Sequence, residues 1–69
     1  MTPKETAEEL VEKYVRITRE YYKGTKYVIN IEDKKKRALI DVDKILSNDN
    51  LYTELFIYYS EVKREIEKL

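Results

Sequence analysis

The sequence predicts an all-α protein, a small three-helix bundle formed by one domain over residues 1–69. Three observations lead to this prediction. Apolar residues recur every three or four positions in long segments, which is the period of a helix with one buried face. The chain contains one Gly and one Pro, so few positions are set aside for turns. Hydrophobic residues make up 42% and charged residues 41%, as amphipathic helices with solvated outer faces require.

The first segment predicts a helix over residues 3–23. Thr2 is a favourable N-cap, Pro3 occupies a position where a backbone N–H is dispensable, and Glu5 stands at the capping-box position. Gly24 follows the segment and can adopt the left-handed conformation that ends many helices. One apolar stripe runs along the predicted helix: Ala7, Leu10, Tyr14, Ile17 and Tyr21.

The last segment predicts a helix over residues 51–68. Asp49 or Asn50 is the expected N-cap, since both side chains accept hydrogen bonds from the free N–H groups of a first turn. Glu54, near the start, suits the positive end of the helix dipole. The apolar stripe again has helical spacing: Tyr52, Leu55, Tyr59, Val62, Ile66 and Leu69.

The middle segment admits two interpretations. As a helix over 31–46 it is capped by Asn30 and has acidic Glu32 and Asp33 in its first turn. As a β-hairpin within residues 26–43 it would give an α-β-β-α fold. The hairpin would have to turn at Glu-Asp-Lys-Lys-Lys-Arg, which has no Gly or Asn-Gly pair to supply positive φ. We therefore favour the helix, with 25–29 as an extended connector that lays Tyr27 and Val28 over one end of the bundle.

Three stretches of the chain resemble a group of natural proteins. These stretches are Thr-Pro-Lys-Glu-Thr-Ala-Glu-Glu-Leu-Val-Glu-Lys-Tyr at 2–14, Lys-Arg-Ala-Leu-Ile-Asp-Val-Asp-Lys-Ile-Leu at 36–46, and Tyr-Tyr-Ser-Glu-Val-Lys-Arg-Glu-Ile-Glu-Lys-Leu at 58–69. Together they are similar to short all-helical proteins of Bacteroidetes-type gut bacteria and their phages or prophages. The resemblance implies a helical middle segment and a phage- or prophage-encoded accessory protein, but it implies no activity.

The residue types argue against catalysis. The chain has no His and no Cys, so it lacks the usual base near neutral pH and the best nucleophile. Asp41 and Asp43, two positions apart on a helix, point away from each other and cannot hold one ion together. We expect no enzyme activity, no cofactor and no metal site.

The charges balance overall and in each third of the sequence, which argues against nucleic acid as a partner. The chain has fourteen basic and fourteen acidic residues. The N-terminus shows no apolar signal region. No uncharged run approaches a membrane span, so we expect a cytoplasmic protein, in the host cytoplasm if phage-encoded.

The one basic run offers three candidate phosphate contacts: Lys34, Lys36 and Arg37. Lys35, beneath the apolar stripe, is expected to run its stem along the core edge. The alternative function is weak nucleic-acid binding through a helix-turn-helix-like arrangement of the second and third helices.

Seven tyrosines give the small chain a high aromatic content. Four lie on the predicted stripes and are expected in the core with their hydroxyls at its edge: Tyr14, Tyr21, Tyr52 and Tyr59. For Tyr22, Tyr27 and Tyr58 the sequence leaves packing and partner contact equally open.

Some apolar residues fall on the wrong helical faces. Leu55 to Tyr59 is a run of five consecutive apolar residues, so that turn is hydrophobic all round. On the second helix Ile40 lies opposite the apolar stripe. A small domain with no disulfide gains stability from burying more surface against a partner. We therefore expect self-association, such as a homodimer, or docking to another protein through a surface that contains Ile40, Phe56, Ile57 and Tyr58.

Overall fold

The computed structural model describes residues 1–26 and 28–69, and three helices account for most of them. They are α1 at Pro3–Tyr21, α2 at Ile31–Leu46 and α3 at Thr53–Lys68. The contested middle segment is helical, and no strand occurs among the described residues. The three-helix prediction is confirmed and the α-β-β-α alternative is wrong. Tyr27 lies outside the described residues, so its expected place over one end of the bundle is left open.

Helix α1 begins as its sequence indicates. The Thr2 hydroxyl accepts a hydrogen bond from the Glu5 backbone N–H at 3.2 Å, and the Glu5 carboxylate accepts from the Thr2 N–H at 3.1 Å. The hydrogen bond from the Thr2 N–H, and next the one that the Thr2 hydroxyl donates to the same carboxylate oxygen at 3.0 Å, lower the pKa of the Glu5 carboxyl. The helix ends at Tyr21, two residues earlier than expected. Gly24 follows in the turn at a φ of 80°, a conformation that favours glycine.

Helix α2 has the expected bounds. The Asn30 side chain accepts a hydrogen bond from the Asp33 N–H at 3.2 Å, which caps the first turn. The Lys35 side chain is 13% exposed, and its ammonium donates to the Glu67 carbonyl at 3.3 Å. The lysine stem therefore runs along the core edge, as its place beneath the stripe predicted, and joins α2 to the end of α3.

Helix α3 begins later than expected and without a side-chain cap. Its N-cap residue is Tyr52, whose side chain makes no capping hydrogen bond. The prediction that Asp49 or Asn50 caps this helix is wrong, because these residues belong to a turn. In that turn the Asn48 side-chain oxygen accepts a hydrogen bond from the Asn50 N–H at 3.0 Å, and the Asn48 backbone carbonyl accepts one from the Leu51 N–H at 3.1 Å.

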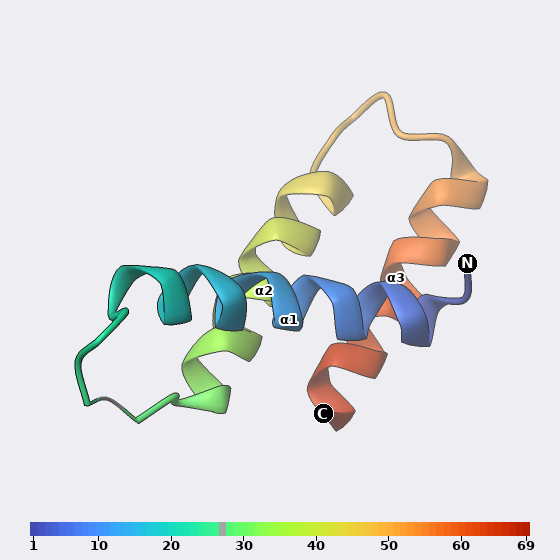
Figure 1. Ribbon diagram of the computed structural model, residues 1–69. Helices are drawn as coiled ribbons and strands as arrows, with labels where there is room; N and C mark the ends of the chain where they lie inside the picture. The colour runs from blue at the N-terminus through green and yellow to red at the C-terminus, as the bar shows by residue number, and fades with distance from the viewer. Residues whose placement is uncertain (27) are drawn as a thin grey trace.

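The helices pack as an antiparallel pair crossed by the third. Helices α2 and α3 run in opposite directions, with α1 across them (Figure 1). An ion pair between Asp43 Oδ1 and Lys63 Nζ at 3.0 Å shows which levels of α2 and α3 lie side by side. The ends of α2 and α3 nearest their connection rise past α1, whereas the C-terminal end of α1 projects beyond the pair (Figure 1). The arrangement leaves both ends of the molecule less covered than its middle.

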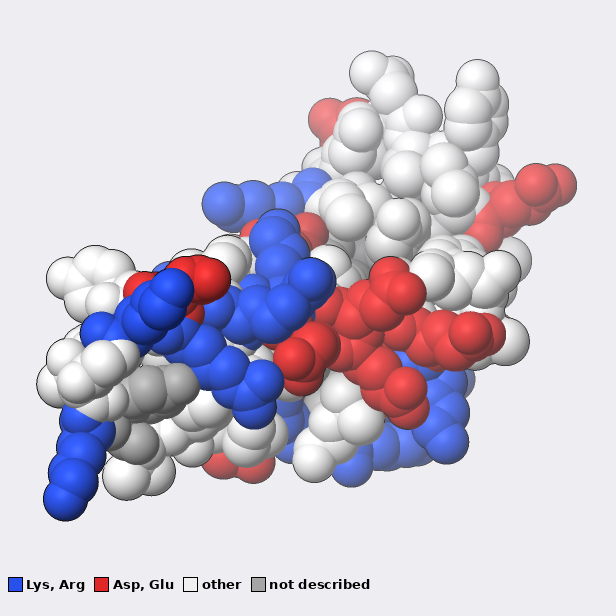
Figure 2. Space-filling model, viewed as in Figure 1, with Lys and Arg blue, Asp and Glu red and all other residues white. Residues whose placement is uncertain are grey.

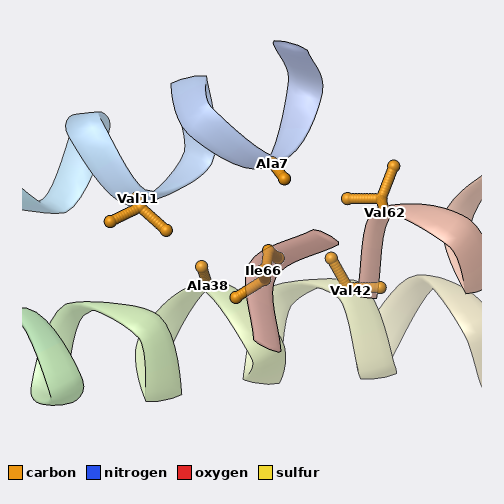
Figure 3. Close-up of a cluster of buried hydrophobic side chains, with 6 residues drawn as sticks. All are labelled: Ala7, Val11, Ala38, Val42, Val62 and Ile66. Carbon is orange, nitrogen blue, oxygen red and sulfur yellow. The ribbon is translucent and has the colours of Figure 1, made fainter. Parts of the chain in front are cut away.

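The core lies where the three helices cross. Ala7 and Val11 of α1 point toward side chains of α2 and α3 (Figure 3). All seven buried residues among those described are small or medium-sized: Ala7, Val11, Val15, Ala38, Val42, Val62 and Ile66. The larger Leu10, Tyr14, Leu39, Leu46, Tyr58 and Tyr59 pack against this cluster only partly buried. The fully buried core is therefore modest.

Two of the four tyrosines expected in the core lie outside it. Tyr14 and Tyr59 pack against the core, but Tyr21 is 80% and Tyr52 is 77% exposed. Each of these two falls on the predicted stripe at an end of its helix, beyond the buried crossing of the three helices. Ile17, near the end of α1, is more than half exposed for the same reason. The prediction of core positions for Tyr21 and Tyr52 is wrong.

Candidate interaction surface

The surface with the least charge is the end of the molecule where α2 joins α3. We call residues 45–60 the hairpin tip; it comprises the end of α2, the connection and the first half of α3. Its charged residues are Asp49 and Glu54, both acidic. Figure 2 shows this end as a largely white area, whereas blue and red side chains are prominent over the rest of the visible face.

Large apolar side chains are exposed on the hairpin tip. Tyr52 is 77%, Leu55 43%, Phe56 50% and Ile57 54% exposed. These four residues form the tip patch. Positions 55 to 57 are consecutive, so their side chains point in three directions around the helix axis. A helix that is apolar all round is normally buried. Here only the sides that face α1 and α2 have cover.

The position of α1 explains why burial decreases along α3. Leu55 and Val62 are seven residues apart and share a helical face. Val62 is fully buried, whereas Leu55 is 43% exposed. Leu55 is the third residue of α3, whereas Val62 lies near its middle. The first turns of α3 rise past α1 (Figure 1). Tyr52 and Leu55 therefore continue the face of α3 that forms the core, beyond the reach of α1, whereas Phe56 and Ile57 lie on other sides of the helix.

Tyr58 was a candidate interface residue, and the structure places it against α1 instead. Its hydroxyl is hydrogen bonded to the Thr6 hydroxyl. It also lies 3.3 Å from the Met1 carbonyl oxygen and 3.4 Å from the Thr2 carbonyl oxygen. Tyr58 is half-buried at the core edge, so it holds the start of α1 on α3 and does not belong to the tip patch.

Ile40 is as exposed as Ile57 but lies apart from it. Both side chains are 54% exposed. The Asp43–Lys63 ion pair lies between them. Ile40 is three residues from Asp43, and Ile57 is six residues from Lys63 toward the opposite end of the antiparallel pair. At 1.5 Å per residue they are separated by roughly 13 Å along the helix axes. We expected Ile40, Phe56 and Ile57 to share one surface, and this prediction is wrong, because the structure keeps Ile40 apart from the other two.

The candidate phosphate contacts are partly neutralised. Lys34 Nζ lies 3.3 Å and Arg37 Nε 3.6 Å from the same Asp33 carboxylate oxygen. The hydrogen bond and charge of Lys34, with the charge of Arg37, lower the pKa of Asp33. Lys36 is exposed. The three cations lie on the first turns of α2, far from the α2–α3 connection that a helix-turn-helix arrangement would use.

A net positive charge gathers at the end of the molecule where α1 joins α2. Residues 13–37 contain nine basic and three acidic side chains. A count of charges over thirds of the sequence hides this excess, because the segment is divided between two of them. Basic side chains are prominent on that side of Figure 2. We call this region, residues 13–37, the basic end.

Asp41 and Asp43, the acidic pair of α2, are engaged in separate structural contacts. Tyr14 donates its hydroxyl hydrogen to an Asp41 carboxylate oxygen, and this hydrogen bond, followed by burial, raises the pKa of Tyr14. Asp43 is paired with Lys63. Among the described residues no three His, Cys, Asp or Glu side chains are grouped as a metal site.

Comparisons with known proteins give no family assignment. No protein family matches the chain, and neither does any curated protein or solved structure. None of the described helices combines the length and the apolar character needed to cross a membrane. Functional inference therefore depends on the surfaces described above.

Proposed function

We propose that this protein is a small interaction domain that binds another polypeptide through the tip patch. The observation that carries the proposal is the run Leu55 to Tyr59 in α3, which is apolar around the helix yet leaves Leu55, Phe56 and Ile57 about half exposed. Aromatic and aliphatic side chains of this kind form the centres of protein interfaces, where charged residues are depleted. The sequence resemblance adds a phage or prophage origin to this proposal, so that the protein is an accessory protein that acts by binding.

Site-specific photo-cross-linking in the cells that produce the protein tests this proposal. A photoreactive phenylalanine analogue is placed at Ile57 in one variant and at Ile40 in another. The two positions are matched because both are helical isoleucines with the same exposed fraction. We expect covalent polypeptide adducts from position 57 in much higher yield than from position 40. Equal yields at both positions would contradict the proposal.

The basic end supports a second candidate function, weak binding of single-stranded nucleic acid. This segment has an excess of six positive charges and contains the exposed ring of Tyr21, and aromatic rings next to cations are the usual means of holding unpaired bases. Fluorescence anisotropy with a labelled oligonucleotide checks this candidate. Binding that weakens steeply with salt and is lost in Tyr21→Ala would support it; no binding at low salt would exclude it.

A further inference from the structure

We infer that the partner that covers the tip patch is a second copy of this chain. The inference rests on the proposed function, because it assigns an occupant to the same patch. It places the hairpin tips of two copies against each other about a two-fold axis. The result is a homodimer in which each tip supplies the cover that the other lacks.

The whole chain exposes more surface than a compact monomer of its mass, by an amount comparable with one standard interface. The chain exposes 5436 Å², and its mass is 8.4 kDa. A compact monomer of this mass exposes roughly 4600 Å², so the excess is about 800 Å². A standard interface buries about 800 Å² on each partner. The dimensions of 44 × 20 × 18 Å agree with this excess, because a molecule so elongated leaves the ends of its helices uncovered.

The modest core gives a reason for the partner to be always present. The largest fully buried side chains are Ile66, Val42 and Val62, and the chain has no cysteine to form a disulfide. A domain of this size with so small a core gains stability when its folded form binds a partner. A second copy is the one partner present wherever the chain itself is made.

The chemistry of the tip also suits a two-fold interface. In such an interface the same patch meets itself, so it must be self-complementary. Apolar side chains meet this condition without charge matching, and the tip has no basic residue to pair with its two acidic ones. Two hairpin tips placed face to face bring together four helix ends, as in a four-helix bundle. Because its two charges are both acidic, we expect the dimer to hold at high salt, whereas a complex with nucleic acid would dissociate.

Sedimentation equilibrium of the full chain tests the inference with a matched pair of variants, Ile57→Lys and Ile40→Lys. We expect the wild type to be a dimer at micromolar concentration. Ile57→Lys should raise the dissociation constant roughly tenfold or more, and Ile40→Lys should leave it nearly unchanged. Circular dichroism of each variant checks that the helices persist. Tyr52→Lys, which changes a residue just before α3, replaces Ile57→Lys if that variant unfolds.

The outcomes separate this inference from the proposed function. Weak complexes form at concentrations of about 100 μM. If the wild type is still monomeric there, the second copy is not the partner. A dimer weakened equally by both variants would overturn the tip as the contact. If the cross-links from position 57 hold only polypeptides other than this chain, the dimer is wrong while the proposed function stands. If position 57 yields no preferential adduct of any kind, both are wrong.

Discussion

The hairpin tip and the basic end expose similar amounts of apolar side chain but differ in the charge around it. Tyr52 in the tip is 77% exposed, and Tyr21 at the basic end is 80% exposed. In the tip, residues 45–60 carry two charges; in the basic end, residues 13–37 carry twelve. Exposed apolar residues scattered among charges are ordinary surface features, whereas several of them gathered where charges are few indicate an interaction site. The comparison shows that exposure alone does not identify the interface.

The largest expected effect comes from the core that both ends share. Ile66→Ala removes the largest fully buried side chain and leaves a cavity, so it should lower the free energy of unfolding by about 2–5 kcal/mol. Ile40→Ala, at an exposed position, should change it by less than about 0.5 kcal/mol. Urea denaturation followed by circular dichroism measures both values. Equal effects would mean that the crossing of the three helices is not the centre of the fold.

The next effect compares the two ends directly. Tyr52→Lys introduces a charge into the tip patch, and Tyr21→Lys introduces the same charge at the basic end. We expect Tyr52→Lys to cost the dimer on the order of 1–2 kcal/mol of association free energy and Tyr21→Lys to cost almost none. Light scattering over a dilution series measures the dissociation constants. A larger effect of Tyr21→Lys would place the interface at the wrong end of the molecule.

The comparison also shows which features could be predicted from the sequence. Thr2 with Glu5 and Asn30 with Asp33 determine where α1 and α2 begin, because capping depends on neighbouring residues. The exposure of Tyr21 and Tyr52 could not be predicted in the same way. Helical spacing tells which side of a helix faces the core, but the length of that side that is covered depends on where the other helices cross.

The candidate surface shows the same division between local and long-range information. Phe56 and Ile57 were found because a five-residue apolar run leaves the buried stripe whatever the packing. The separation of Ile40 from these two residues could not be predicted, because the sequence does not show which residues of α2 and α3 lie at the same level. That register depends on contacts such as Asp43 with Lys63, twenty residues apart in the chain. Tyr58 likewise turned inward because α1 begins beside it.

A smaller effect is expected where α1 meets the tip. Tyr58→Phe removes the hydroxyl that bonds Thr6 and lies near the carbonyl oxygens of Met1 and Thr2. The loss should lower the free energy of unfolding by about 1 kcal/mol, since the remaining groups are partly open to water. Thermal unfolding of the two proteins at equal concentration measures it. A neutral result would show that this hydroxyl does not fasten α1 to α3.

The smallest effect concerns Tyr14, where α1 meets α2, and appears only in alkaline solution. The hydrogen bond to Asp41 raises the pKa of Tyr14 above its ordinary value of 10.0. The folded state therefore favours the protonated phenol, and its stabilising contribution is complete below pH 10.0 and is lost as pH rises through the raised pKa. Tyr14→Phe should abolish this part of the alkaline destabilisation. Urea titrations between pH 9 and 12, a range that brackets the ordinary tyrosine pKa of about 10, measure the free energy of unfolding of both proteins. An identical alkaline profile in both proteins would contradict the hydrogen bond.

The central claim, that the hairpin tip is covered by a second copy while the basic end remains in water, is tested most directly on the wild-type chain. Hydroxyl-radical footprinting read by mass spectrometry reports the solvent access of Tyr52 and Tyr21 in one sample. These residues are of the same type and nearly equal exposure in the single chain. As protein concentration rises from nanomolar to high micromolar, the oxidation rate of Tyr52 should fall while that of Tyr21 stays constant. If the two rates remain equal at every concentration, no second copy covers the tip.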